Sequence, residues 1–467
     1  MILQPVNNNR IAGSFRDPSG FLFRRDDFIY RQINIVYQPH YDYLIQSGLY
    51  EKLVQENLLI PHLEADIPPE EESTAYKIIQ PEIIPFISYP YEWCFSQLKS
   101  AALTTLRIQK IALHSDMTLK DASAFNIQFR KGKPILIDTL SFERYKEGFP
   151  WIAYRQFCQH FLALLALMAL TDVRLNQLAR IYIDGIPLDL ASALLPKSSW
   201  FRFGILSHIH LHAKSQKHFG DKKVKAARHG ISKTSLSGII DSLEATIQEI
   251  HWKPEGTEWG SYYEDTNYSP EALNQKKEII RQYLNAINPK SVWDMGANTG
   301  LFSRLASARG IQTISFDIDP AAVEKNYREV LANKEDFILP LCLDLTNPSP
   351  GIGWENRERA SIQDRRPVDV IFALALIHHL AISNNLPFIK IARFFSGLCR
   401  YLVIEFVPKS DSQVQRLLAT REDIFPLYTQ GHFEKEFSAD FQRQRTDRIA
   451  KSERILYLWK TMRGASK

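Results

Sequence analysis

The chain has 467 residues, 45% of them hydrophobic and 23% charged, which is the composition of a folded globular protein and not of a disordered or fibrous one. This length predicts two or three domains. The net charge is +5, and each half of the chain carries only a small positive excess. Because nucleic-acid binding needs clustered Lys and Arg, we do not expect DNA or RNA as a partner.

Cysteine usage and hydropathy both indicate a cytoplasmic protein. The four cysteines lie far apart and form neither a CxxC motif nor a zinc pattern. The first residues lack the charged and apolar regions of a secretory signal. The longest apolar run, residues 161–170, is half the length of a membrane span, so we expect a buried helix there and no transmembrane segment.

The first domain, residues 1–213, mixes strand and helix patterns and predicts an α+β fold. Its expected elements are a hairpin at 21–24 and 28–33, a helix at 40–57, strands at 76–79 and 83–87, a helix at 91–113, strands at 127–129 and 135–137, and then a mostly helical segment.

Three polar residues in this domain have a distinctive spacing. Asp121 and Asn126 are five residues apart, and Asp138 follows twelve residues later, after the apolar strand I-L-I. This pattern resembles the catalytic loop and metal-binding aspartate of kinase-like phosphotransferases, in which Asp121 would orient an acceptor hydroxyl while Asn126 and Asp138 would hold magnesium. Leu-Lys-Asp replaces His-Arg-Asp, and no glycine-rich loop is evident upstream. The domain is thus either a degenerate kinase-like module that recognises an acceptor or an enzyme that uses Mg-ATP.

A connecting segment, residues 214–250, combines a basic stretch with a helix. Residues 214–233 contain seven Lys or Arg and one Asp, which favours a solvated surface connection. Just before it, His208, His210 and His212 have the period of two that would align them on a strand as a metal site. The neighbouring residues fit a helix equally well and no acidic ligand is close, so we expect no metal site.

The second domain, residues 251–467, alternates helices and strands as a parallel α/β sheet does. Helices are expected at 270–288, 301–309, 321–332 and 386–398, and strands at 291–294, 313–317, 338–343, 368–374 and 401–407.

Acidic residues follow three successive strands of this domain. Asp294 ends the first strand and is followed by a turn with Gly296 and Gly300 that opens a helix. Asp317 ends the second strand, seventeen residues after Gly300, and Asp344 follows the third. Because ligands bind at the carboxyl ends of such strands, we expect one crevice that holds a nucleotide-like ligand.

The pattern resembles that of class I S-adenosylmethionine (SAM)-dependent methyltransferases, which implies a Rossmann-like sheet with helices on both faces. In that family the residues matching Asp294, Gly296 and Gly300 contact the methionine part of SAM. The resemblance further implies that Asp317 binds the ribose and that Asp344 lies beside the adenine.

The turn departs from the family pattern at Asn298, where many members carry glycine. This change is mild, because Asn tolerates left-handed backbone conformations better than most residues. The spacing D-x-G-x-x-x-G also differs from the G-x-G-x-x-G turn of dinucleotide-binding proteins, and it favours SAM over NAD as the cofactor.

Residues after the third, fourth and fifth strands are candidates for catalysis and substrate binding. His379 and His378 follow the fourth strand, where a neutral imidazole would remove a proton from an acceptor hydroxyl. Trp354 and Arg357 lie in a long insertion after the third strand, and Glu405 ends the fifth. A small-molecule or glycan-type acceptor is our preference, whereas the acceptor atom and the oligomeric state are not predicted.

The whole chain also resembles a bacterial group of two-part proteins that includes one linked to nodulation and to methyl transfer. The strings L-K-D-A-S-A-F-N and I-E-F-V-P-K-S-D carry this resemblance. It implies a SAM-dependent methyltransferase. Two alternatives stay open: a bifunctional kinase-like methyltransferase and a non-catalytic scaffold that binds SAM.

Overall fold

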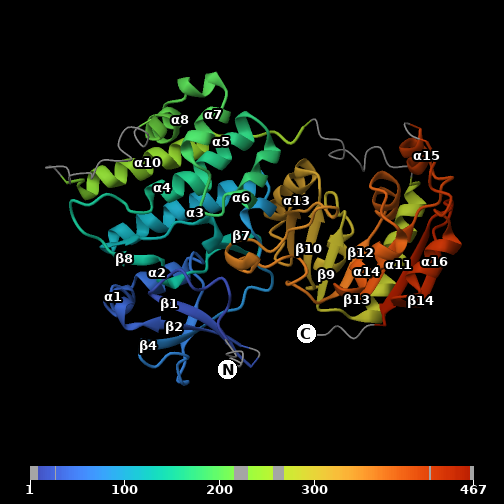
Figure 1. Ribbon diagram of the computed structural model, residues 1–467, viewed down its shortest axis with the longest axis horizontal. Coiled ribbons are helices and arrows are strands. Elements are labelled where there is room, and N and C mark those ends of the chain that lie inside the picture. Colours follow the sequence, from blue (N-terminus) through green and yellow to red (C-terminus); the bar gives the residue numbers. More distant parts are fainter. Residues whose placement is uncertain (1–8, 27, 215–229, 256–267, 420–421, 463–467) are drawn as a thin grey trace, which may run out of the picture. The chain divides into compact units, whose positions relative to one another are not determined.

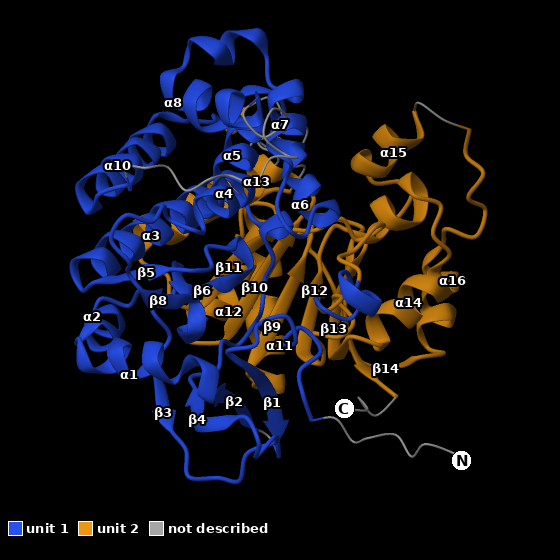
Figure 2. Cartoon of the chain, turned by 60° about the vertical axis from the view of Figure 1, so that its left-hand side comes forward, with its two compact units in different colours: residues 1–253, 351–359 blue, residues 254–350, 360–467 orange. Residues whose placement is uncertain are grey.

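The computed structural model describes residues 9–26, 28–214, 230–255, 268–419 and 422–462 (Figure 1). The chain divides into two compact units (Figure 2). Unit 1 comprises residues 1–253 together with 351–359, and unit 2 comprises residues 254–350 and 360–467. Unit 1 combines antiparallel strands with helices, and unit 2 is built on a mainly parallel sheet, so the predicted mixed α/β class is confirmed.

Unit 1 contains a four-stranded antiparallel sheet with the order β1-β2-β4-β3. Its strands are β1 Gly20–Arg25, β2 Phe28–Asn34, β3 His62–Glu64 and β4 Ala75–Pro81. The predicted hairpin is confirmed. The predicted strand at 83–87 is wrong, because Pro81 and Pro85 have no N–H to donate and the chain leaves the sheet after Pro81.

The predicted helix at 40–57 is two helices, α1 Gln38–Gln46 and α2 Leu49–Gln55. Gly48 separates them with a φ of +73°, a left-handed conformation that ends α1 and starts α2 in a new direction. The apolar and aromatic residues keep a helical spacing on both sides of Gly48, which is why the sequence predicted one helix.

Helices make up most of the remainder of unit 1 (Figure 1). They are α3 Phe95–His114, α4 Tyr154–Phe157, α5 Ala163–Leu170, α6 Leu178–Ile181, α7 Leu188–Leu194, α8 Phe203–Ile205 and α10 Lys233–Glu249, with π-helical segments η5 Cys158–Leu162 and η8 Leu206–Leu211. Two short antiparallel pairs join β5 Met117–Leu119 to β8 Phe142–Arg144 and β6 Ile127–Arg130 to β7 Lys133–Leu136.

The apolar run at 161–170 lies in η5 and α5, and its first eight residues are buried, so the predicted buried helix is confirmed. Among the described residues, none of the helices combines the length and hydropathy that a bilayer crossing requires.

The three histidines before the basic stretch lie on a helical turn and not on a strand. Both ring nitrogens of His210 contact hydroxyls, Nδ1 at 2.7 Å from Ser192 Oγ and Nε2 at 2.9 Å from Ser199 Oγ. His208 likewise contacts Tyr154 and Ser242. The imidazoles of His208 and His210 are therefore satisfied by neutral protein groups.

Unit 2 is built on a seven-stranded sheet with the order β11-β10-β9-β12-β13-β15-β14. Its strands are β9 Ser291–Met295, β10 Gln312–Asp317, β11 Ile338–Cys342, β12 Val368–Ala373, β13 Cys399–Phe406, β14 Phe441–Arg448 and β15 Ile455–Thr461. The first five strands in this order are parallel, and the direction of winding reverses between β9 and β12. This reversal is the switch point at which doubly wound sheets bind ligands.

The predicted strands and helices of unit 2 are confirmed up to β13. The helices are α11 Pro270–Ile287, α12 Ser303–Ser307, α13 Pro320–Asn333, α14 Phe388–Ser396, α15 Ser412–Leu418 and α16 Gln430–Phe437. The hairpin of β14 and β15 was not predicted. Strand β15 lies antiparallel between β13 and β14 and so extends the sheet beyond its parallel part.

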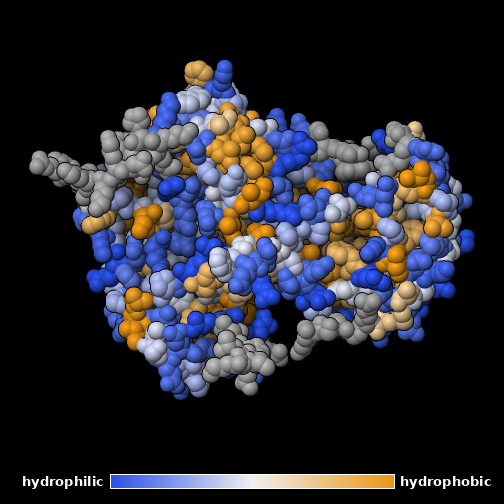
Figure 3. Space-filling view, in the orientation of Figure 1, coloured by the Kyte–Doolittle hydropathy of each residue, from blue (hydrophilic) through white to orange (hydrophobic). Residues whose placement is uncertain are grey.

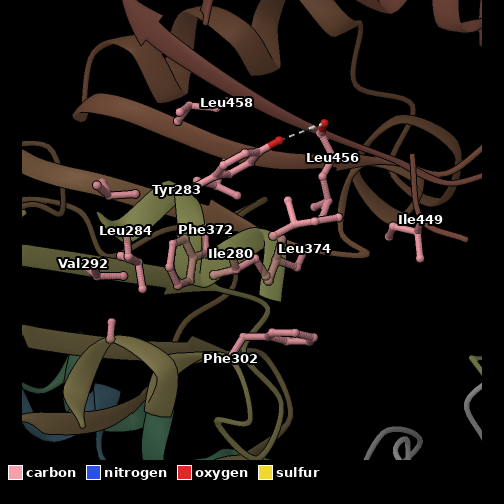
Figure 4. Close-up of a cluster of buried hydrophobic side chains, with 14 of the residues drawn as sticks. Ile280, Tyr283, Leu284, Val292, Phe302, Phe372, Leu374, Ile449, Leu456 and Leu458 are labelled. Atoms are coloured by element: carbon pink, nitrogen blue, oxygen red, sulfur yellow. Dashed lines mark hydrogen bonds between the residues drawn. The ribbon is translucent and has the colours of Figure 1, made fainter. Parts of the chain in front are cut away.

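A buried apolar cluster fixes α11 against this sheet (Figure 4). Ile280, Tyr283 and Leu284 of α11 pack with Val292 of β9 and Phe372 of β12. Burying one such side chain stabilises a fold by about 1.5–3 kcal/mol. The packed face of α11 thereby holds the first turns of the helix beside the carboxyl ends of the strands.

Candidate functional site

Unit 2 contains a cavity of about 440 Å³ at the carboxyl ends of β9, β10, β11 and β12. Five of the six residues expected to bind the cofactor line it, namely Asp294, Gly296, Asn298, Asp317 and Asp344. They come from three strands that are adjacent in the sheet, and the cavity therefore lies at the switch point of the sheet.

The turn after β9 is tied to the next strand by backbone hydrogen bonds. The N–H groups of Gly296 and Ala297 both donate to the carbonyl oxygen of Phe316, at 2.9 and 2.8 Å. Asn298 has a φ of +51°, and its N–H donates to Asp317 Oδ2 at 2.7 Å. The left-handed conformation of Asn298 thus aims its backbone at the carboxylate of the second strand.

Gly300, the sixth expected residue, does not line the cavity. Its φ is +82°, and a Cβ atom there would lie 2.6 Å from Asn326 Nδ2. Glycine is therefore required at this position for the turn and for close packing against α13, whose Asn326 side chain donates to Ser315.

The buried carboxyl groups of Asp294 and Asp317 have raised pKa values. Asp294 accepts a hydrogen bond from Ser303 Oγ at 2.6 Å, yet burial raises its pKa to about 7. Asp317 accepts from the N–H groups of Asn298 and Asp319, and burial raises its pKa to about 6. Because their charge is costly in this environment, both side chains gain from cationic or hydroxyl donors placed in the cavity.

At the edge of the cavity, Asp344 and Ile318 form a partly open rim. Asp344 Oδ1 accepts hydrogen bonds from the backbone and hydroxyl groups of Thr346, at 2.8 and 2.6 Å. Ile318 is an exposed apolar residue directly after Asp317, and it lines the cavity. Ile318 was not predicted from the sequence, because an apolar residue after a strand carries no signal of its own.

The two candidate histidines have different positions. His379 begins the π-helical segment η10 His379–Ser383 and lines the cavity, whereas His378 is buried outside its lining. Burial, followed by the charge of Arg454, lowers the pKa of His379 to about 4. Burial also lowers the pKa of His378 well below its ordinary value. Both rings are therefore neutral near pH 7.

A buried ion pair that was not predicted from the sequence lies at the wall of the cavity. Lys276 of α11 lines the cavity, and its Nζ is 2.6 Å from Glu405 Oε2 at the end of β13. The hydroxyl of Tyr268 donates to Glu405 as well, and Lys276 Nζ lies 3.2 Å from that hydroxyl. Burial lowers the pKa of Lys276. The sequence does carry one sign of this pair: Lys276 lies within the apolar stripe of α11, three residues after Leu273.

A second buried cation extends this pair. Arg454 Nη1 lies 3.7 Å from Glu405 Oε1, and the Arg454 Nε and Nη2 atoms donate to the two oxygens of Asp411 at 2.7 and 3.0 Å. Burial alone would raise the pKa of Glu405, but Lys276 and Arg454 outweigh it and the pKa is lowered. The set of two cations and two anions is therefore neutral as a whole.

Glu405, predicted as a substrate contact, serves inside this cluster. Its oxygens accept from Lys276, from Tyr268 and from the N–H of Ala375 at 2.8 Å, and it does not line the cavity. Trp354 and Arg357, the other predicted substrate contacts, lie in the segment 351–359, which belongs to unit 1, and both side chains are exposed. The structure does not group these three residues with the cavity of unit 2.

Asp121, Asn126 and Asp138, which the sequence predicts as a kinase-like site, lie close together in unit 1. Asn126 hydrogen-bonds Asp121, whose pKa is raised by burial and by the nearby charge of Asp138. Asp138 is ion-paired with Arg31 of β2, and its Oδ1 accepts from the N–H of Leu140 at 2.9 Å. Among the described residues, no group of three or more His, Cys, Asp or Glu is arranged to hold a metal ion.

We predict that Lys276 and Glu405 contribute to the free energy of unfolding as a coupled pair. Lys276→Met leaves the Glu405 carboxylate short of one partner and should lower the free energy of unfolding by about 3–5 kcal/mol, whereas Lys276→Met with Glu405→Gln should cost less than the sum of the two single changes. Urea titration of the unit 2 transition measures this. Lys451→Met, at the exposed pair with Glu271, is the control and should leave the transition unchanged. Strict additivity of the two buried changes would contradict the coupling.

No protein-family model matches the chain. The nodulation protein NoeA of Rhizobium meliloti (strain 1021) is 32% identical over 459 residues, which are 96% of this chain and 95% of that protein. This match extends through both units.

Solved structures with local similarity include three methyltransferases. Magnesium protoporphyrin IX methyltransferase ChlM from Synechocystis PCC 6803 with bound SAH is 18% identical, with a TM-score of 0.30 over 41% of this chain and 84% of its own. WbdD is 14% identical, with a TM-score of 0.29 over 40% of each chain. The methyltransferase domain of bacterial CtHen1 is 14% identical, with a TM-score of 0.29 over 41% of this chain and 98% of its own.

The match to NoeA confirms the resemblance to a nodulation-related bacterial group that the sequence strings indicate. The chain belongs to the family of the nodulation protein NoeA.

Proposed function

We propose that unit 2 is a SAM-dependent methyltransferase. The observation that carries this proposal is that Asp294, Asp317 and Asp344, from three adjacent parallel strands, line one cavity at the switch point of the sheet. The cavity volume of about 440 Å³ is within the range of small-molecule and cofactor sites.

The donors and acceptors of this cavity suit the parts of SAM. Asp317 would accept hydrogen bonds from the ribose hydroxyls, and Asp294 would face the ammonium group, because each buried carboxylate gains from such a donor. Ile318 and Asp344 at the rim would hold the adenine. Two buried carboxylates that line the cavity, Asp294 and Asp317, support this fit, because burial raises their pKa values.

His379 is the candidate general base. SAM supplies a methyl group on a sulfonium for in-line displacement, so the protein must orient the acceptor and take up its proton. The His379 ring is neutral near pH 7 and lines the cavity, and it can therefore accept that proton. His378 lies outside the lining and would support His379 by packing, since the two ring centroids are 4.2 Å apart.

The wall beside His379 favours an uncharged acceptor. Leu376, Leu380 and Leu417 line it together with Ser383 and Asn384. Among the described residues that line the cavity, Lys276 is the only Lys or Arg, and Glu405 already neutralises it. A small molecule or glycan-type compound with a neutral hydroxyl fits this surface better than a phosphate or a carboxylate does.

For unit 1 we propose acceptor recognition. Asp138, which would hold magnesium in a kinase-like enzyme, is neutralised by Arg31, and this pairing disfavours metal-dependent phosphoryl transfer. The bifunctional alternative requires Mg-ATP to bind at Asp121, Asn126 and Asp138. The scaffold alternative requires SAM to bind to unit 2 without turnover.

Calorimetric titration of the full chain with SAM tests the cofactor assignment. Asp317→Ala should weaken SAM binding by about ten- to a hundredfold, because it removes buried hydrogen bonds worth about 1.5–3 kcal/mol. Asp364→Ala, at an exposed acid outside the cavity lining, is the matched control and should bind SAM as the parent does. A chain that binds Mg-ATP and not SAM would refute the proposal and favour the phosphotransferase alternative.

We expect SAM affinity to rise with pH between about 5.5 and 7. The raised pKa of Asp294, about 7, means that the carboxyl is protonated in the lower part of this window and cannot pair with the ammonium of SAM. Each carboxyl should contribute at most about tenfold per pH unit, as one pKa unit corresponds to about 1.4 kcal/mol. Asp317, whose pKa is about 6, adds to the lower part of this rise. Asp294→Asn should therefore flatten the profile between about pH 6.5 and 7 and leave the part near pH 6. A steep rise between about pH 6.5 and 7 that persists in this variant would assign the titration there to another group.

Turnover should depend on His379. His379→Asn should reduce methyl transfer from radiolabelled SAM to the small-molecule fraction of a bacterial extract by about 10²- to 10⁴-fold while SAM affinity changes little. His378→Phe should instead lower the thermal midpoint, because His378 is buried. Equal transfer by the parent and the His379 variant would remove His379 from the mechanism, and SAM binding with no transfer by either protein would favour the scaffold alternative.

A further inference from the structure

Unit 1 exposes two adjacent aromatic side chains at its helical end. Phe201 ends the 3₁₀ turn η7 Lys197–Phe201 and is 92% exposed, and Phe203 begins α8 and is 77% exposed. Leu211 and Leu194 are also exposed, at 49% and 40%. Figure 1 shows α7 and α8 at the end of unit 1 away from β1, β2 and β4, and Figure 3 shows hydrophobic residues at the surface of this end.

The packing of the neighbouring residues fixes these side chains in their outward direction. A Cβ atom at Gly204 would lie 1.9 Å from Thr246 Oγ1, so the backbone of α8 meets α10 closely at this glycine. On the other side of Phe201, the Trp200 ring stacks on His210 with ring centroids 4.2 Å apart and an interplanar angle of 9°. The two phenylalanines therefore project from an anchored turn.

The charged residues in the stretch of chain that carries these side chains have one sign. The sequence from Leu190 to Lys214 contains no Asp or Glu, and Lys197, Arg202 and Lys214 are exposed. Lys214 Nζ lies 4.7 Å from the centre of the Trp200 ring, which places a cation beside the aromatic residues. On the neighbouring helix α10, Asp241 and Glu244 are engaged by Lys110.

We propose that this aromatic–basic face docks on the surface of an anionic lipid bilayer. The face comprises four apolar and three cationic residues, namely Leu194, Phe201, Phe203 and Leu211 with Lys197, Arg202 and Lys214. Aromatic side chains that enter the headgroup boundary and cations that meet anionic headgroups are the two signals of interfacial binding. Four exposed apolar side chains are too few for a stable protein interface, which uses about 20–30 residues a side. The proposal does not depend on SAM binding by unit 2.

Vesicle co-sedimentation of the full chain tests this face. Vesicles of phosphatidylcholine with about 30% phosphatidylglycerol should bind the protein at least tenfold more strongly than pure phosphatidylcholine vesicles, and 0.5 M salt should weaken the binding. Phe201→Ser with Phe203→Ser should reduce binding to the anionic vesicles at least tenfold, because two apolar insertions are lost. Lys197→Ala with Arg202→Ala should reduce the preference for anionic over neutral vesicles.

A matched double change elsewhere in unit 1 is the control. Phe15 and Phe28 are also exposed, and Phe15→Ser with Phe28→Ser should leave vesicle binding unchanged. Equal binding by the Phe201/Phe203 variant and the parent would overturn the proposal, as would no binding of the parent to either kind of vesicle. If the parent sediments as a dimer and the Phe201/Phe203 variant as a monomer, the face binds a second copy of the chain instead.

Discussion

The buried pair of Lys276 and Glu405 is the interaction on which the cavity of unit 2 depends. It joins α11 to the end of β13, and Glu405 also accepts from the N–H of Ala375 after β12. Arg454 carries the connection to Asp411, the N-cap of α15, and α15 supplies Leu417 to the cavity wall. One charge cluster therefore positions three parts of that wall. Removing a single member leaves a buried charge without its partner, which costs more than the pair contributes.

The buried carboxylates of unit 2 differ in how far neighbouring groups compensate their burial. Asp294 and Asp317 are held by hydrogen bonds from Ser303, Asn298 and Asp319, and these bonds only partly offset their burial. Glu405, in contrast, faces two cations and stays ionised. Unit 2 thus separates Glu405, whose charge two cations compensate, from Asp294 and Asp317, whose burial is only partly offset and which line the cavity.

Sequence patterns predicted the parallel part of unit 2 because each of its strands is short, apolar and followed by a polar turn. Strand β14 was not predicted, because its sequence, F-Q-R-Q-R-T-D-R, is polar, as that of an edge strand can be. It forms a strand by pairing with β15, which its own sequence does not indicate. The roles of the acidic residues of the cavity rest on the resemblance to SAM-dependent methyltransferases, but these residues lie at the ends of strands and were predicted from the strand pattern. Lys276 and Arg454 were not, because their partners are 129 residues away in Glu405 and 43 residues away in Asp411.

The insertion after β11 shows why the chain cannot be divided by a single cut. Residues 351–359 leave unit 2 and complete unit 1, where the buried Glu358 accepts from Arg16 at 2.7 and 3.0 Å. The guanidinium of Arg359 lies 4.6 Å from the centre of the Phe125 ring, next to Asn126. A fragment that ended at Lys253 would lack these contacts and would leave Arg16 without Glu358. Unit 1 is therefore completed by a segment that follows β11 of unit 2 in the chain.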